Sequence, residues 1–220
     1  MTQILKDICM DTSLSPFLGF KGGTAALMFY GLDRFSVDLD FDLLDAARAD
    51  DVFERVKRIL SPYGAMRDAE KKRFNLFFAI SYEEAARNIK VEVNLRSFGS
   101  RYEIKSHLGI PMLVMVREDM FAHKLVAMKE RIGKTNRDIY DVWFFLKNRW
   151  PLNQEIVERR TKMPLKDFLP RCIAELERFS DRAILSGMGE LLGEKQKAWA
   201  KGHLRKDTIF LLKLLLEGQE

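Results

Sequence analysis

Apolar and polar residues alternate along residues 37–43, where four apolar positions are separated by aspartates. An alternation with a period of two is typical of a half-buried strand, because successive side chains point to opposite faces of a sheet. We therefore expect a strand here, with Val37, Leu39, Phe41 and Leu43 on its buried face. Short apolar runs predict the remaining strands, at residues 16–23, 74–81, 89–95 and, as one strand or two, within 104–116.

Helical patterns divide the chain into two parts. In the first part we expect helices at residues 24–30 and 46–60, the second ending before the Ser-Pro-Tyr-Gly sequence at 61–64. Apolar residues with the period of a helix predict further helices at residues 118–132, 136–149 and 207–216. This order of elements predicts an α+β fold, in which an α+β region at residues 1–116 is followed by a helical region at 117–220.

The composition is typical of a soluble globular protein, because 47% of the 220 residues are hydrophobic and 31% are charged. No apolar stretch approaches the roughly 20 residues that a spanning helix needs, and the N-terminus lacks the order of a secretory signal. Cys9 and Cys172 are too far apart in sequence to suggest a disulfide framework or a thiolate zinc site. We therefore expect a cytoplasmic protein that does not bind a membrane. The net charge of +5 favours a nucleic-acid partner only weakly.

Gly22, Gly23 and Thr24 form a turn at the start of the predicted helix. Glycines permit a close backbone approach and positive φ angles. Because unpaired N–H groups and the positive end of the dipole converge at a helix N-terminus, such a turn suits an anionic phosphate. Thr24 is placed either to cap the helix or to hydrogen-bond a phosphate oxygen. The turn alone is a weak signal, since most such sequences are only turns.

Asp38 and Asp40 lie two residues apart on the predicted strand, with Cα atoms expected about 7 Å apart and both carboxylates on one side. These carboxylates repel each other unless a cation lies between them, and their oxygens suit Mg²⁺ or Mn²⁺. A pair of such ions would clamp the attacking and leaving oxygens of a phosphoryl transfer. The alternative is a solvated edge strand with an acidic face. We expect Asp42, at the far end of this face, to be solvated or to support the site without binding metal.

Gly-Gly-Thr-Ala at residues 22–25 is followed by a predicted helix and then by Arg-x-Ser-x-Asp-Leu-Asp-Phe at residues 34–41. This order resembles the AbiEii/AbiGii-type nucleotidyltransferases, which are toxins of bacterial toxin–antitoxin and phage-defence systems. They belong to the DNA polymerase β-like nucleotidyltransferase superfamily. The resemblance implies a mixed sheet with helices and a metal-dependent reaction with a nucleoside triphosphate. It also implies that Arg34 contacts the triphosphate and that Ser36 orients the strand or a phosphate, although a simple loop role suits Ser36 equally.

In that superfamily a third acid comes from a neighbouring strand. Residues 89–95 alternate so that Lys90, Glu92 and Asn94 share one face. The resemblance implies that Glu92 completes a metal site with Asp38 and Asp40 or acts as a base on the acceptor hydroxyl. On the pattern alone, an exposed glutamate on an amphipathic strand is the commoner case.

The resemblance continues with Phe-Ala-His-Lys-Leu-Val-Ala-Met at residues 121–128, then Arg131, then Arg-Asp-Ile-Tyr-Asp at residues 137–141. It implies that Lys124 contacts the nucleotide phosphates and that Asp138 is linked to activity. Met128 departs from the threonine or serine that some members carry four residues after the lysine, so the fine placement of the nucleotide stays open. The alternative for Asp138 and its neighbour Arg137 is a structural ion-pair network with other helices.

Together these motifs predict a magnesium-dependent nucleotidyltransferase that moves a nucleoside monophosphate from a nucleoside triphosphate to an acceptor. By resemblance the acceptor is tRNA or another RNA, and a cognate antitoxin protein restrains the toxin. Two rival functions remain at this point. One is the modification of a small molecule such as an aminoglycoside, and the other is a non-catalytic interaction module of the same fold. The sequence leaves open whether Asp42, Arg137 and Asp141 take part in the site.

Overall fold

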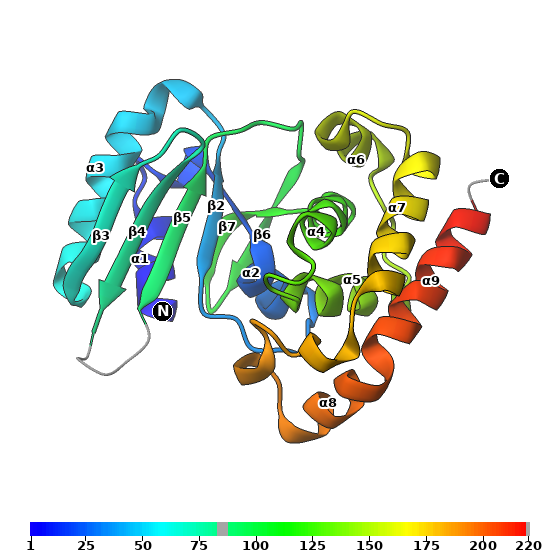
Figure 1. Cartoon of the computed structure of the whole chain (residues 1–220). Coiled ribbons are helices and arrows are strands. Elements are labelled where there is room, and N and C mark those ends of the chain that lie inside the picture. The colour runs from blue at the N-terminus through cyan, green and yellow to red at the C-terminus, as the bar shows by residue number, and fades with distance from the viewer. Residues whose placement is uncertain (83–87, 219–220) are drawn as a thin grey trace. The chain divides into compact units, whose positions relative to one another are not determined.

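Figure 1 shows the chain as a computed structural model, which describes residues 1–82 and 88–218. The chain divides into two compact units, Met1–Val116 and Arg117–Glu220. We call the first the sheet unit and the second the helical unit, and each is described by itself. No helix within the described ranges is long and apolar enough to cross a membrane.

The sheet unit contains one mixed sheet, for which the described residues give the strand order β3-β4-β5-β2-β1-β7-β6. Its strands are β1 (Leu18–Lys21), β2 (Leu39–Leu43), β3 (Ala65–Lys71), β4 (Asn75–Ser81), β5 (Ile89–Asn94), β6 (Tyr102–His107) and β7 (Ile110–Met115). The helices of this unit are α1 (Thr2–Met10), α2 (Gly22–Tyr30) and α3 (Ala49–Leu60). The pairs β1–β7 and β2–β5 are parallel, and the other neighbouring pairs are antiparallel. The predicted combination of a mixed sheet with helices is confirmed.

Alternation along the central strands separates the core from a polar face. Leu39 and Phe41 on β2 lie beside Val91 and Val93 on β5, and all four side chains are buried. Figure 1 shows α1 and α3 against the sheet, and α3 contributes Phe53, whose ring lies 5.1 Å from that of Phe78 on β4. The alternate positions of β2 and β5 carry the acidic residues, so one strand pair builds both the core and a polar face.

Three local predictions differ from the structure. The strand expected from Val37 begins only at Leu39, so Asp38 lies in the irregular segment before β2. The strand expected at residues 16–23 ends at Lys21, because α2 already begins at Gly22. The strand β3 was not predicted. It lies at the edge of the sheet and is largely exposed, so its sequence is charged and lacks the alternation that a buried face requires.

The helical unit confirms the helices that were predicted after residue 116. Its α-helices are α4 (Arg117–Arg131), α5 (Arg137–Lys147), α6 (Gln154–Thr161), α7 (Leu165–Arg178), α8 (Glu194–Trp199) and α9 (Arg205–Glu217). A π-helical segment, Ala200–Leu204, joins α8 to α9. Aromatic residues hold these helices together, as Trp143 on α5 lies 4.2 Å from Trp199 on α8 between ring centroids.

Candidate active site

The N-terminus of α2 lies against the side chain of Asp40. Gly22 is the first residue of α2 and has a φ of +79°, which favours glycine. A Cβ atom at this position would lie 2.3 Å from Asp40 Oδ2. No other residue type fits this space unless Asp40 or the backbone moves. The turn that the sequence assigned to phosphate binding therefore contacts one of the two aspartates assigned to metal binding.

Gly23 extends this contact to the segment before β2. A Cβ atom at position 23 would lie 2.8 Å from Ser36 Oγ and 2.9 Å from Arg34 Nη2. Arg34 is buried, and its Nη1 donates a hydrogen bond to the Phe35 carbonyl oxygen at 2.9 Å. The guanidinium of Arg34 thus lies beside the glycine turn, where the sequence predicted a contact to a triphosphate.

The prediction that Thr24 caps α2 is wrong. The N-cap is Lys21, and no side chain hydrogen-bonds to the N-terminus of α2 as a cap. Thr24 is instead fully buried, and its hydroxyl hydrogen-bonds to Ser36 Oγ at 3.0 Å and to the Asp38 carbonyl oxygen at 2.5 Å. Because the helix begins two residues earlier than expected, Thr24 faces the segment that leads into β2 and holds Asp38 beside the turn.

The strand register brings Glu92 beside Asp40. The strands β2 and β5 are parallel neighbours, and Asp40 pairs with Glu92 in the register, so both side chains lie on the same face of the sheet. Asn75 Nδ2 on β4 donates a hydrogen bond to Glu92 Oε1 at 2.7 Å. Asp38, Asp40 and Glu92 are all half-buried. The third acid thus lies on a strand adjacent to β2, while its role in the reaction stays a prediction.

The donor set fits a divalent cation in its chemistry. Asp40 has a carboxylate beside the glycines of the turn, and Asp38 belongs to the segment that Thr24 holds there. Mg²⁺ commonly takes one or two carboxylates together with substrate phosphates and water. Across residues 1–82 and 88–218, however, no group of three histidine, cysteine or acidic side chains is close enough to hold a metal ion. The residues therefore suit a site that the substrate completes better than a cage built from protein alone.

Asp42 is not solvated, so the first of the two roles expected for it is wrong, and a supporting role without metal binding stays a prediction. Its side chain is buried, forms an ion pair with Lys21 at 2.5 Å and accepts hydrogen bonds from Asn94 Nδ2 at 2.6 Å and from the Tyr102 hydroxyl at 2.5 Å. Burial would raise the pKa of the Asp42 carboxyl, but the charge of Lys21 and these hydrogen bonds outweigh burial and lower it. Asp42 is thus a neutralised structural acid, although it shares a strand face with Asp40.

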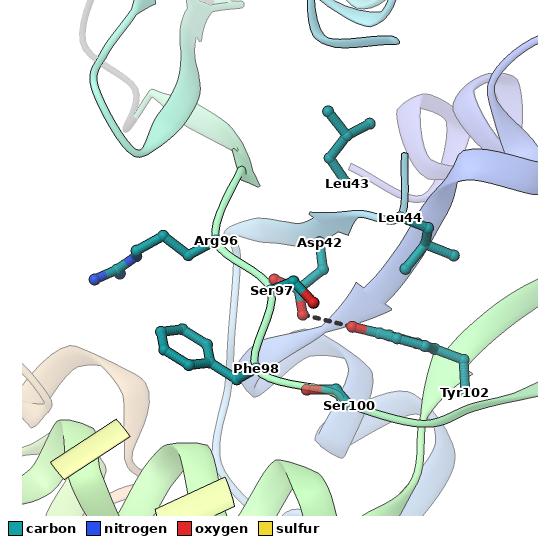
Figure 2. A pocket seen from close by; sticks show the side chains of 8 residues that line it. All are labelled: Asp42, Leu43, Leu44, Arg96, Ser97, Phe98, Ser100 and Tyr102. Carbon is teal, nitrogen blue, oxygen red and sulfur yellow. Dashed lines mark hydrogen bonds between the residues drawn. The ribbon is translucent and has the colours of Figure 1, made fainter. Parts of the chain in front are cut away.

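A pocket of about 170 Å³ opens beside Asp42. Figure 2 shows Asp42 and Tyr102 pointing toward one another at its edge, joined by their hydrogen bond. The pocket is lined by Asp42, Leu43, Leu44, Arg96, Ser97, Phe98, Ser100 and Tyr102. Its one carboxylate is already neutralised by Lys21, and Arg96 adds a positive charge, so the pocket is not acidic.

In the helical unit, Lys124 and Asp138 belong to a buried network of charges. Lys124 Nζ on α4 lies 2.8 Å from Asp138 Oδ1 and 2.7 Å from Asp141 Oδ2 on α5. Arg131 Nη1 lies 3.4 Å from Asp138 Oδ2. Both aspartates are fully buried, so truncation of Lys124 would leave buried negative charge without this partner. The structural ion-pair network, which was the alternative interpretation of Asp138, is therefore present. The contact of Lys124 with phosphates stays a prediction.

Four side chains that contact Asp42 or Glu92 were not predicted from the sequence. Lys21, Asn94 and Tyr102 surround Asp42, and Asn75 holds Glu92. The period-two pattern already placed Asn94 on the face of Glu92, and this signal could have suggested a partner for Asp42. Lys21, Asn75 and Tyr102 come from three other strands, so only the strand register reveals them.

Solved nucleotidyltransferases share this fold. A candidate nucleotidyltransferase from Helicobacter pylori is 23% identical, with a TM-score of 0.57 over 100% of this chain and 94% of that chain. The nucleotidyltransferase toxin MenT4 from Mycobacterium tuberculosis is 18% identical, with a TM-score of 0.59 over 96% of this chain and 81% of that chain. At these identities the likeness shows the fold alone. A search of curated proteins found no match.

The family follows from the sequence. The profile of a family described as "Nucleotidyl transferase AbiEii toxin, Type IV TA system" matches residues 3–202. The chain therefore belongs to the AbiEii nucleotidyltransferase toxin family and is a nucleotidyltransferase.

The pairing of Asp42 predicts a pH-dependent contribution to stability. At pH 7, Asp42→Asn should lower the free energy of unfolding by about 3 kcal/mol, because Lys21 loses its buried counter-charge. A carboxyl whose pKa is lowered by folding stabilises fully above its unfolded pKa of about 3.9 and loses this effect as pH falls through the folded pKa. The difference between wild type and variant, measured by urea unfolding, should therefore shrink below about pH 4.

The matched control is Asp51→Asn, which removes an exposed aspartate whose ion pair with Arg48 is solvated. This variant should unfold with nearly wild-type free energy at both pH values. Equal stability of Asp42→Asn and wild type at pH 7 would show that the ion pair between Lys21 and Asp42 makes no net contribution to the free energy of unfolding.

Proposed function

We propose that this enzyme transfers a nucleoside monophosphate from a nucleoside triphosphate to an acceptor hydroxyl, with Mg²⁺ or Mn²⁺ as cofactor. The observation that carries the proposal is the contact between Gly22 at the N-terminus of α2 and the carboxylate of Asp40. Phosphates bound at the helix N-terminus would lie next to this carboxylate. Two anionic groups this close require a cation between them, and hard oxygen ligands favour a divalent metal.

The glycine turn and Arg34 would bind the triphosphate. The first backbone N–H groups of α2, at Gly22, Gly23 and Thr24, lie at the positive end of the helix dipole. The guanidinium of Arg34 lies beside Gly23 and can donate to phosphate oxygens. The Thr24 and Ser36 hydroxyls bond to each other, so we assign both residues to holding the Asp38 segment. From the helical unit, Lys124 would add a positive charge to the phosphates.

Asp38 and Asp40 would hold the metal, with Glu92 nearby. Mg²⁺ or Mn²⁺ supplies neutralisation of the charge that develops on the phosphate oxygens during transfer. Glu92, fixed by Asn75, would complete the metal site or accept the proton of the acceptor hydroxyl. The hydroxyl oxygen would then form a bond to the α-phosphorus while the bond to pyrophosphate breaks. Asp138 would support this reaction by orienting Lys124.

We favour RNA, with tRNA as one candidate, over a small-molecule acceptor. A cationic antibiotic such as an aminoglycoside would require an acidic pocket, and the pocket beside Asp42 is not acidic. The basic surplus of the chain suits a polyanionic acceptor. The family description, a toxin–antitoxin system, supports the proposal of a cognate antitoxin that restrains the enzyme. Nucleoside triphosphates and RNA both occur in the cytoplasm, where we place the reaction.

The first prediction from the proposed function concerns Asp38 and Asp40. Asp38→Asn and Asp40→Asn should each reduce nucleotide transfer by about 10³-fold or more, because charge stabilisation of the transferring phosphoryl group is lost. The assay combines each labelled nucleoside triphosphate in turn with Mg²⁺ or Mn²⁺ and either total cellular RNA or an aminoglycoside. A chelator should abolish labelling, and added metal should restore it.

The control variant Asp50→Asn removes an exposed aspartate of the same unit, and its activity should equal that of wild type. Circular dichroism should show all three variants folded. Near wild-type transfer by Asp38→Asn would exclude the metal-site assignment. Label on an aminoglycoside and none on RNA would favour the small-molecule alternative, and no transfer to any acceptor would favour a non-catalytic module.

The second prediction tests the contact between Gly22 and Asp40. Gly22→Ala should reduce transfer by about 10²-fold or more, because its Cβ atom would displace the Asp40 carboxylate. Gly31→Ala is the matched control, since Gly31 at the other end of α2 has a φ of +72° and nothing within 4 Å of its Cβ position. Both variants carry similar backbone strain, of about 1 kcal/mol in the free energy of unfolding. Equal activity losses in the two variants would show that strain, and not the displacement of Asp40, explains the effect.

A further inference from the structure

The basic surplus of the chain lies entirely in the helical unit. Residues 117–220 contain 21 lysines and arginines against 16 aspartates and glutamates, whereas residues 1–116 contain 16 of each. The helical unit therefore carries a net charge of +5 and the sheet unit a net charge of zero. A charge confined to one unit attracts a polyanion to that unit, most strongly where several cations converge.

Such a place is a groove of about 290 Å³ between α4, α6 and α7, which we call the basic groove. It is lined by Val126, Lys129, Glu130, Arg160, Thr161, Met163, Phe168 and Arg171. Three of these side chains are cationic and one is anionic. The groove therefore combines a net positive charge with an apolar lining, which is formed by Val126, Met163 and Phe168.

Two of its cations are available to a ligand. Neither Lys129 nor Arg171 forms an ion pair with any residue that the structure describes. The charge of Lys129 acts on the buried thiol of Cys172 on α7, where it opposes the burial that raises the pKa of that thiol to about 12. Lys129 on α4 is thus electrostatically coupled to α7, the helix that carries Arg171.

The third cation is held in place by the protein. Arg160 Nη1 donates to the His123 carbonyl oxygen at 3.1 Å and lies 3.0 Å from His123 Nδ1. Since a guanidinium can only donate, His123 Nδ1 accepts and carries no proton. Glu130, the one acid of the groove, lies 3.5 Å from Arg160 Nη2 and is mostly exposed. The guanidinium of Arg160 is therefore held in place, whereas the side chains of Lys129 and Arg171 can turn toward a ligand.

We propose that the basic groove binds the phosphodiester backbone of a nucleic acid and so anchors the acceptor on the helical unit. This inference rests on the proposed function, because it assumes that the acceptor is a nucleic acid. The cations Lys129 and Arg171 come from two different helices that also line the groove with apolar residues. Such a lining suits phosphates joined by a nucleoside, and counterion release favours their pairing. A nucleic acid repeats one charge and one nucleoside in every sequence, whereas an acidic polypeptide alternates charged and apolar groups only in particular sequences, so we favour the nucleic acid.

The experiment measures binding without any nucleoside triphosphate, to RNA, to DNA of equal length and to polyglutamate, over a range of salt concentrations. The double variant Lys129→Gln with Arg171→Gln should bind RNA about tenfold more weakly. Its plot of log affinity against log salt should be less steep by about 0.7 for each lost contact, or about 1.4 in total. Equal effects on RNA and DNA would identify the backbone as the ligand, and an effect on RNA alone would add a contact to the 2′-hydroxyl.

The control is the double variant Lys195→Gln with Lys201→Gln, which removes the same charge from exposed positions of the helical unit outside the groove. Its binding should stay close to that of wild type. Equal losses in both double variants, or an unchanged salt slope in the groove variant, would overturn the proposal. Tighter binding of polyglutamate than of RNA, lost in the groove variant, would overturn it in favour of an acidic protein partner.

Failure of this inference is distinguishable from failure of the proposed function. Asp38→Asn should bind RNA with wild-type affinity although its nucleotide transfer is reduced by about 10³-fold or more. The groove variant should show a raised KM for the RNA acceptor with an unchanged kcat, because the chemical step is left intact. Wild-type KM in the groove variant would overturn the groove while leaving nucleotidyl transfer in place.

Discussion

Gly22 and Asp40 approach each other so closely that a Cβ atom at position 22 would lie 2.3 Å from Asp40 Oδ2. This approach follows from the pairing of β1 with β2, which places Lys21 opposite Asp40 at the point where β1 ends and α2 begins. The positive end of the α2 dipole thus lies next to a carboxylate of the protein itself. A phosphate at the same helix end would lie near that carboxylate, and this repulsion is the reason why the proposed function includes a divalent cation.

The same strand places two aspartates in different surroundings. Asp40 and Asp42 lie two residues apart on one face of β2, yet Asp42 is buried and neutralised by Lys21, whereas Asp40 is half-buried beside the glycine turn. Thr24 has a structural role here, because its buried hydroxyl hydrogen-bonds to the backbone carbonyl oxygen of Asp38. In the helical unit, Lys124 and Asp138 meet in a buried network that stabilises α4 against α5. A role of these two residues in the reaction would therefore be combined with a structural one.

Much of the fold could be predicted from the sequence because its signals are local. The alternation around Leu39 and Phe41 and the helical period around Trp143 follow directly from side-chain direction in strands and helices. The edge strand β3 could not be predicted in this way, since a strand with largely exposed side chains needs no apolar face. The helix α1 was also missed, although its buried residues Ile4, Leu5 and Ile8 follow a helical spacing.

The candidate site was predictable in its acids and its turn, but not in its supporting contacts. Glu92 could be placed beside Asp40 only through a resemblance, and the register of β5 then supplied the contact with Asn75. The start of α2 was expected at Thr24, and this error of two residues changed Thr24 from a helix cap into the residue that holds Asp38. The partners of Asp42 come from strands far apart in sequence, which local patterns do not reveal.

The most direct test of the account is a crystal structure with Mn²⁺ and a non-hydrolysable nucleoside triphosphate, in which anomalous scattering locates the metal. We expect manganese about 2.1 Å from carboxylate oxygens of Asp38 and Asp40, with the phosphates against the backbone N–H groups of Gly22, Gly23 and Thr24. Manganese bound away from these two aspartates, or phosphates bound away from the glycine turn, would contradict it.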